Sequence, residues 1–133
     1  MQNKIVVRYM DGSVKKGMTN DFMPNKEVFH LTPMDSPPDT KPAEILIRDL
    51  KAVFFVKDFT GNKDYQDNLT ADPSKPTVGR KITVVFRDGE TLAGTTQGFQ
   101  HGRAGFFVFP FDAKSNIDRC FVITAATSKI SFM

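Results

Sequence analysis

The chain repeats itself at a fixed spacing of 77 residues. Residues i and i + 77 are identical at 11 of the 32 positions from 4 to 35, where unrelated sequences of average composition would share about two. The match continues to the end of each copy without a gap, since Val53 pairs with Ile130 and Phe55 with Phe132. Duplication of one small unit therefore constrains the fold more than any other feature. The identical pairs are Lys4/Lys81, Ile5/Ile82, Val7/Val84, Asp11/Asp88, Gly12/Gly89, Gly17/Gly94, Thr19/Thr96, Phe22/Phe99, Phe29/Phe106, Pro33/Pro110 and Asp35/Asp112.

The repeat divides the chain into two units, 1–57 and 79–133, joined by residues 58–78. The joining segment is rich in turn formers and alternating charges and has few apolar residues, which is typical of a linker. A unit of about 55 residues buries little apolar surface by itself. We therefore expect the two copies to pack against each other as a pseudo-twofold pair.

Each unit begins with a pattern that predicts a β-hairpin. In 4–12 and 81–89, β-branched and aromatic residues alternate in orientation with a period of two, and both stretches end in Asp-Gly, a dipeptide that favours a tight turn. Second strands are expected over 15–22 and 92–99, third strands over 27–33 and 105–110, and closing strands over 43–49, 51–56, 121–125 and 128–133. No stretch has helical periodicity, so the chain is predicted to be all-β.

A glycine lies in the middle of each predicted second strand. Gly17 and Gly94 occupy corresponding positions, and a mid-strand glycine permits the sharp bend that a small closed sheet requires. Five short strands with such a bend predict a small SH3-type barrel in each copy. The predicted architecture is thus two tandem five-stranded barrels.

Two segments resemble the first signature of the Sm-like and Hfq-like family, in which a turn glycine, a mid-strand glycine and a phenylalanine recur at this spacing. They are residues 88–99, DGETLAGTTQGF, and 11–22, DGSVKKGMTNDF. The segment 45–56 is similar to the last two strands of such a unit. The resemblance implies tandem Sm-like barrels and raises RNA as a ligand.

The positions that contact RNA in that family hold other residue types here. Met23 and Gln100 stand where an aspartate would follow the phenylalanine, and Glu27 and Ala104 stand where an asparagine would follow. The resemblance consequently implies the fold and does not imply uridine recognition.

Consecutive phenylalanines point to a surface between the copies or toward a partner. Phe54 and Phe55 adjoin in one unit, and Phe106 and Phe107 in the other. Because neighbouring residues of a strand face opposite sides of the sheet, one phenylalanine of each pair is expected to leave its own core. These four residues predict either a buried seam between repeats or a binding surface.

Basic residues supply an alternative interaction surface. Candidates for contact with phosphates are a glycine-rich loop of the second copy and a stripe on the first copy, which would form if its first two strands expose one face together. The net charge of +3 tolerates a polyanion without requiring one. The candidate residues are Arg8, Lys15, Lys16, Arg48, Gly102 and Arg103.

No catalytic, metal or cofactor site is predicted. Cys120 is the only cysteine and lies in a strand-like segment, and His30 and His101 do not correspond to each other in the repeat. The turn aspartates Asp11 and Asp88 are explained by hairpin chemistry. No recognised motif for nucleotide binding, acyl transfer or metal-assisted hydrolysis is present.

The overall expectation is a non-catalytic binding protein. With 40% hydrophobic and 25% charged residues and no apolar run near the roughly 18 residues of a membrane span, we expect no membrane contact. Residues 1–12 lack the apolar core of a signal peptide, so we expect a cytoplasmic protein, and the resemblance implies a bacterial one. The leading hypothesis is an adaptor that holds another protein through sheet edges or exposed aromatics. RNA or single-stranded nucleic acid binding is the alternative, a small-ligand or nucleotide sensor is a third, and homo-oligomers are left open.

Overall fold

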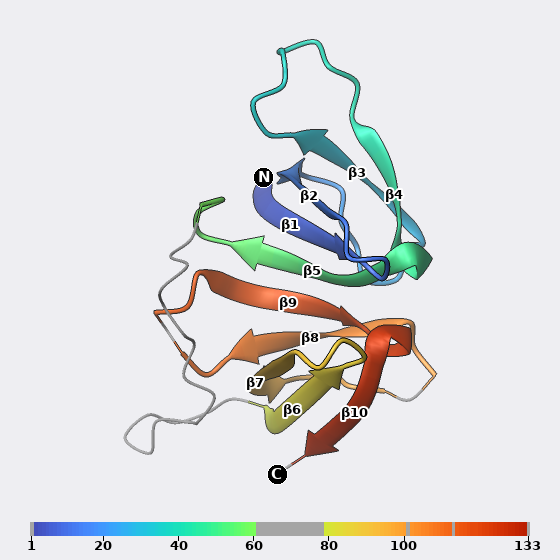
Figure 1. Cartoon of the computed structure of the whole chain (residues 1–133), viewed down its shortest axis with the longest axis vertical. Coiled ribbons are helices and arrows are strands. Elements are labelled where there is room, and N and C mark those ends of the chain that lie inside the picture. Colours follow the sequence, from blue (N-terminus) through green and yellow to red (C-terminus); the bar gives the residue numbers. More distant parts are fainter. Residues whose placement is uncertain (1, 61–78, 101, 113, 133) are drawn as a thin grey trace.

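The all-β class is confirmed by a computed structural model that describes residues 2–60, 79–100, 102–112 and 114–132. The described residues form ten strands, and every pair of neighbouring strands is antiparallel (Figure 1). They are β1 (Asn3–Tyr9), β2 (Val14–Thr19), β3 (Val28–Pro33), β4 (Ala43–Leu46), β5 (Leu50–Val56), β6 (Arg80–Phe86), β7 (Thr91–Thr96), β8 (Gly105–Pro110), β9 (Ile117–Ile123) and β10 (Thr127–Phe132).

Regular helix is limited to two short 3₁₀ turns in the described residues. They are η1 (Ile47–Asp49) and η2 (Thr124–Ala126), and they correspond at the 77-residue spacing. Each connects the fourth strand of its repeat to the fifth. Within the part of the chain that the structure describes, no helix is long and apolar enough to cross a membrane.

The two repeats arrange their strands in the same order within one continuous sheet. The full order is β10-β6-β7-β8-β9-β5-β1-β2-β3-β4. In each repeat the fifth strand pairs with the first, which is followed by the second, third and fourth. The predicted linker lies outside the described residues from position 61 to 78.

The junction between the repeats pairs β5 of the first repeat with β9 of the second (Figure 1). β5 is a fifth strand and β9 a fourth strand, so the repeats follow each other head to tail. This geometry differs from the expected pseudo-twofold pair, because a twofold axis would bring equivalent strands together.

The sheet is open, and closure into two separate barrels is not seen among the described residues. The physical reason lies at the junction, where β5 uses one edge for β1 and the other for β9. β9 likewise uses its two edges for β8 and β5. Since both edges of β5 and of β9 are occupied, β5 cannot pair with β4 to close the first repeat, and β9 cannot pair with β10 to close the second. The prediction of five strands in each repeat is confirmed, whereas the prediction of two separate barrels is not, because one sheet runs on between the repeats.

The mid-strand glycines allow the second and third strands to approach closely. A Cβ atom at Gly17 would lie 2.2 Å from the carbonyl oxygen of Thr32, and one at Gly94 would lie 2.0 Å from that of Phe109. The second strands end at Thr19 and Thr96, three residues before the predicted ends. Larger residues at the two glycine positions would separate β2 from β3 and β7 from β8.

Each repeat contains the same three-phenylalanine cluster. In the first repeat, the Phe22 ring packs edge-on against Phe29 and Phe55, with ring centroids 5.1 and 5.4 Å away. The corresponding ring of Phe99 packs against Phe106 and Phe132 at 4.8 and 5.2 Å. The buried side chains of both repeats belong to one hydrophobic cluster that continues across the β5–β9 junction.

Candidate binding surfaces

The four phenylalanines singled out in the sequence occupy three different environments. Phe106 lies in the core of the second repeat, with 6% of its surface exposed. Phe55 and the half-buried Phe107 face each other across the junction, with their ring centroids 6.0 Å apart. Phe54 is buried on the opposite face of β5, opposite Cys120.

The ring of Phe22 joins the cores of the two repeats. Besides its contacts within the first repeat, it packs against Phe121 at 5.2 Å and Phe107 at 6.1 Å, both from the second repeat. Phe107 and Phe121 are register partners on β8 and β9, and their rings lie 5.1 Å apart. The junction is therefore sealed by aromatic side chains from both repeats.

Arg119 covers this seam from β9. Its guanidinium carbon lies 4.3 Å from the Phe55 ring centroid and 5.4 Å from that of Phe107. Its buried Nε has no hydrogen-bond partner among the described residues. Stacking on two aromatic faces is a favourable setting for a guanidinium, because the ring faces carry partial negative charge.

Lys51, near the start of β5, makes a second link between the repeats by contacting acidic residues of the second repeat. Its Nζ lies 2.7 Å from Oδ2 of Asp88, 2.8 Å from Oε1 of Glu90 and 4.6 Å from the Phe86 ring centroid. The side chain of Lys51 is 9% exposed, whereas the two carboxylates are about half exposed. The hydrogen bond from Lys51 lowers the pKa of Asp88, and the backbone N–H of Glu90 lowers it further.

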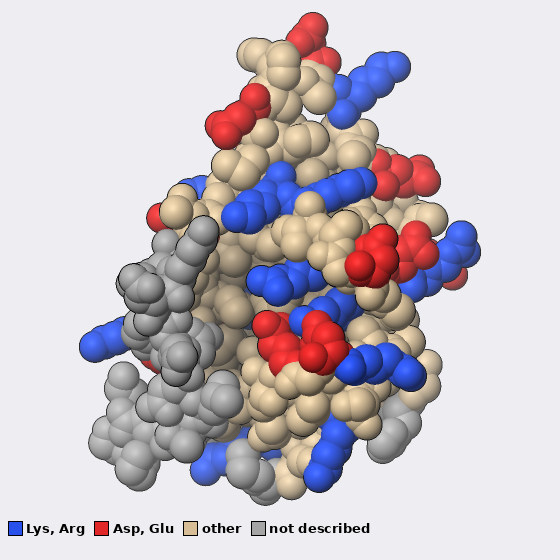
Figure 2. Space-filling model, in the orientation of Figure 1, with Lys and Arg blue, Asp and Glu red and all other residues tan. Residues whose placement is uncertain are grey.

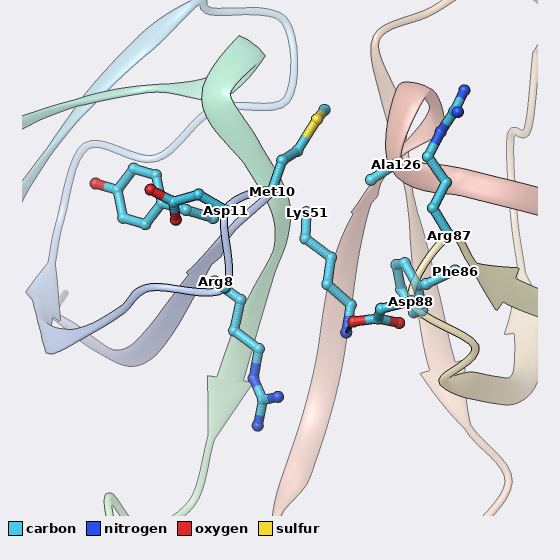
Figure 3. Close-up of a pocket in the computed structure, with 10 residues that line it drawn as sticks. Arg8, Met10, Asp11, Lys51, Phe86, Arg87, Asp88 and Ala126 are labelled. Carbon is cyan, nitrogen blue, oxygen red and sulfur yellow. Dashed lines mark hydrogen bonds and ion pairs between the residues drawn. The ribbon is translucent and has the colours of Figure 1, made fainter.

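A cleft of about 320 Å³ opens beside Lys51, between the hairpin turns of the two repeats (Figure 3). One wall comes from the end of β1 and its turn, and the other from the end of β6, its turn and η2. Figure 3 shows the Lys51 side chain extended from β5 toward Asp88, between the two walls. The lining residues are Arg8, Tyr9, Met10, Asp11, Gly12, Lys51, Phe86, Arg87, Asp88 and Ala126.

The structure brings Arg8 and Lys16 together and places the other predicted anion contacts elsewhere. The register opposes Val6 to Lys16 and Arg8 to Val14, so Arg8 and Lys16 project from one face of the β1–β2 hairpin. Arg8 also approaches Glu90 at 4.0 Å. In Figure 2, basic side chains lie across this part of the molecule and meet acidic ones midway down it.

The remaining predicted contacts are exposed but scattered. The ammonium of Lys15 lies 5.3 Å from the Tyr9 ring centroid, and Arg48 belongs to η1. In the second repeat, Arg103 follows Gly102 in the loop before β8, and its Nε donates to Oε1 of Gln100. These residues do not extend the pair formed by Arg8 and Lys16.

The two outer edges of the sheet differ from each other. β4 has four residues, and Pro42 immediately precedes it. Its register pairs Glu44 with His30, at the positions that correspond to Phe121 and Phe107 in the second repeat. At the opposite edge, β10 has six residues without proline.

Burial at β10 differs from burial at β5, its counterpart in the first repeat. Val53 and Phe55 of β5 are 0% and 4% exposed, whereas the corresponding Ile130 and Phe132 of β10 are only half-buried. β5 is covered by β9 along one edge, and no strand covers the equivalent edge of β10 in the described chain. The uncovered edge explains the greater exposure.

The isolated histidine, cysteine and acidic residues form no candidate metal centre among the described residues. His30 Nδ1 lies 2.7 Å from Oδ2 of Asp21, and His101 is outside the described residues. The Cys120 thiol is fully buried, and burial raises its pKa far above the ordinary range.

The chain belongs to DUF6982, a family of unknown function whose model matches residues 1–133. No curated protein and no solved structure matches the chain.

Proposed function

Because family membership leaves the activity open, we propose from the surfaces themselves that this chain is a non-catalytic adaptor. It holds another protein by adding an extended segment of that protein to the free edge of β10. The observation that carries the proposal is the contrast between two strands with the same place in their repeats. β5 is paired on both edges, with β1 and β9, whereas β10 is paired with β6 on one edge and with no described strand on the other. Addition of a strand to an open sheet edge is a common mode of peptide recognition.

The internal junction supports this mode because it is itself a strand added to the edge of a repeat. β9 lies antiparallel to β5, with Phe121 opposite Val53 and Arg119 opposite Phe55. A partner segment in the same register would face Ile130 and Phe132 at the equivalent positions. Covering these half-buried side chains would remove apolar surface from water, which favours binding.

The residues of β10 specify the chemistry of that segment. Ile130 favours an apolar side chain opposite it, and Phe132 favours an arginine that stacks on its ring, as Arg119 does on Phe55. Lys129 and Ser131 face the other side and favour polar side chains. An acidic residue opposite Lys129 would add an opposite-charge pair. The partner segment therefore places an apolar residue opposite Ile130, an arginine opposite Phe132 and a carboxylate opposite Lys129.

We also propose that each repeat is an SH3-type or Sm-like unit. The shared strand order, the close approach at Gly17 and Gly94, and the 3₁₀ turn before each fifth strand support this assignment. On this view, the second repeat is added to the first through the edges that would otherwise remain open.

The adaptor proposal is tested with a synthetic peptide copied from residues 116–124, with serine in place of Cys120 and glutamate in place of Val122, the residue that would lie opposite Lys129. Hydrogen exchange of the isotopically labelled protein is measured with and without the peptide. The proposal predicts slower exchange in β10, because outward amide groups gain partners. A peptide with proline at its central position, which lacks an N–H for the ladder, is the control and should give no protection.

Protection confined to β4, or equal protection by both peptides, would contradict the adaptor proposal. The peptide control leaves the protein unchanged, so the result does not depend on whether a variant folds.

RNA or single-stranded nucleic acid binding is the second candidate function. The shared face of Arg8 and Lys16 supports it, since two cations at one surface can contact successive phosphates. The measurement is fluorescence anisotropy of a labelled oligouridine at low and higher salt, with Arg8→Ala and Lys16→Ala variants. Affinity that falls steeply with salt and with either substitution supports the candidate, and an absence of binding at low salt eliminates it.

A further inference from the structure

The cleft between the two hairpin turns has an exposed methionine, Met10, on one wall and an arginine, Arg87, on the other. Met10 and Arg87 correspond at the 77-residue spacing, and both line the cleft. We propose that the cleft is a second protein-binding site, which takes a short extended segment carrying an apolar side chain next to a carboxylate. The site uses none of the β10 residues on which the adaptor proposal rests.

Arg87 is positioned to receive the carboxylate. Its Nε donates to the carbonyl oxygen of Ala125 at 2.8 Å, and its backbone N–H donates to that of Ala126 at 2.9 Å. Figure 3 shows the guanidinium extended away from the Lys51–Asp88 contact. Because Nε is held by a backbone carbonyl, the terminal N–H groups are oriented before a ligand arrives, and their planar arrangement matches a carboxylate.

Met10 forms the apolar contact on the facing wall. It is 48% exposed, although its backbone N–H is held by the carbonyl oxygen of Asp49 at 3.1 Å. An exposed methionine on a fixed backbone offers a flexible, polarisable surface that adapts to aliphatic side chains. In Figure 3 the Met10 side chain points to the same end of the cleft as that of Arg87.

Two of the three acidic groups near the cleft are paired with cations. Lys51 bonds to both Asp88 and Glu90, and Arg8 approaches Glu90. Asp11 stays an anion, because the hydrogen bonds that its Oδ1 accepts from the N–H and hydroxyl of Ser13 lower its pKa without supplying a positive charge. Among the described residues, Arg87 is the lining cation that no carboxylate pairs, so its terminal N–H groups favour an acidic ligand at their end of the cleft.

The test is a titration of the ¹⁵N-labelled chain with a blocked hexapeptide, Gly-Ser-Leu-Glu-Ser-Gly, followed by two-dimensional NMR. Saturable shifts are expected at the backbone amides of residues 10–12 and 87–89. The matched peptide with glutamine in place of glutamate should bind about tenfold more weakly, since it loses the charge-assisted pair. Arg87→Gln should remove this preference, and Met10→Ser should weaken both peptides.

Arg103→Gln is the matched control, because Arg103 is also an exposed arginine with its Nε occupied, and it lies outside the cleft. This variant should bind both peptides as the unaltered chain does. The proposal is overturned if neither peptide causes saturable shifts, if both bind equally, or if Arg87→Gln and Arg103→Gln behave alike. Protection of β10 is not measured in this titration, so its failure leaves the adaptor proposal standing.

Discussion

The ammonium of Lys51, in the fifth strand of the first repeat, lies 2.7 Å from the carboxylate of Asp88 in the first hairpin turn of the second. The contact joins segments 37 residues apart in the sequence. It accompanies the β5–β9 pairing, so it should stabilise the relative placement of the two repeats.

Replacing Lys51 by alanine should lower the free energy of unfolding by about 1–2 kcal/mol. The loss is moderate because Asp88 and Glu90 are half exposed and can be hydrated once the ammonium is gone. The measurement is equilibrium unfolding in urea. Lys15→Ala is the control, since Lys15 is exposed, and it should change stability by less than about 0.5 kcal/mol. Equal effects of the two substitutions would contradict the role given to Lys51.

Acid should destabilise the chain partly through Asp88. The hydrogen bond from Lys51 holds the pKa of Asp88 below its ordinary value of 3.8 in the folded state. Its contribution is therefore present above pH 3.8 and is lost as the pH falls through the folded-state pKa. Urea unfolding at a series of pH values should show a smaller loss of stability below pH 4 for Lys51→Ala than for the unaltered chain. Parallel curves for the two proteins would count against this linkage.

Gly17→Ala should be among the most damaging small substitutions, because the added methyl would meet a backbone carbonyl that cannot move independently. We expect a loss of about 3 kcal/mol. Gly12→Ala is the comparison, since nothing lies within 4 Å of its Cβ position and only its positive φ of 91° is unfavourable. That change should cost about 1–2 kcal/mol. Thermal unfolding of both variants checks the order, and a reversed order would exclude the close approach of β2 and β3.

The chain should be a monomer, because its outer edges do not reproduce the internal junction. Continuing the head-to-tail series would pair β10 with β4 of a second copy and set Glu44 opposite Ile130, and Pro42 opposite Phe132. Both pairings are unfavourable. Sedimentation equilibrium should give the monomer mass of 14.9 kDa over a wide concentration range.

A variant that carries the seam residues at the β4 edge tests the same reasoning in the other direction. His30→Phe, Pro42→Arg and Glu44→Phe together should produce reversible, concentration-dependent association. Association of the unaltered chain to a similar degree would show that its edges are not blocked.

Much of the fold could be predicted because its signals are local. Short-range backbone chemistry determines the hairpin turns at Asp11 and Asp88, the glycine bends and the alternating strands. The same local signals occur in both copies of the repeat, which strengthens the prediction. The arrangement of the repeats could not be predicted in this way, because the choice of which strand edges pair between the repeats depends on contacts across the whole chain. Periodicity within a strand carries no information on that choice.

Some of the missing information was present as differences between the copies. The 77-residue spacing pairs His30 with Phe107 and Glu44 with Phe121. This difference indicates that the fourth strand of the second repeat is covered, whereas the fourth strand of the first repeat faces solvent. Lys51 was not predicted as a contact residue, although a lysine beside an apolar strand was a signal that it needed partners. The cleft could not be predicted, because its walls come from hairpins that only the junction brings together.

Native-state hydrogen exchange of individual amides tests the central claim, that β5 and β9 join the repeats and leave β10 at an edge. Every amide of β5 should exchange slowly, since both edges of that strand are paired, whereas fast and slow amides should alternate along β10. A contrary pattern, with alternation in β5 or uniform protection in β10, would show that the repeats are joined in another way.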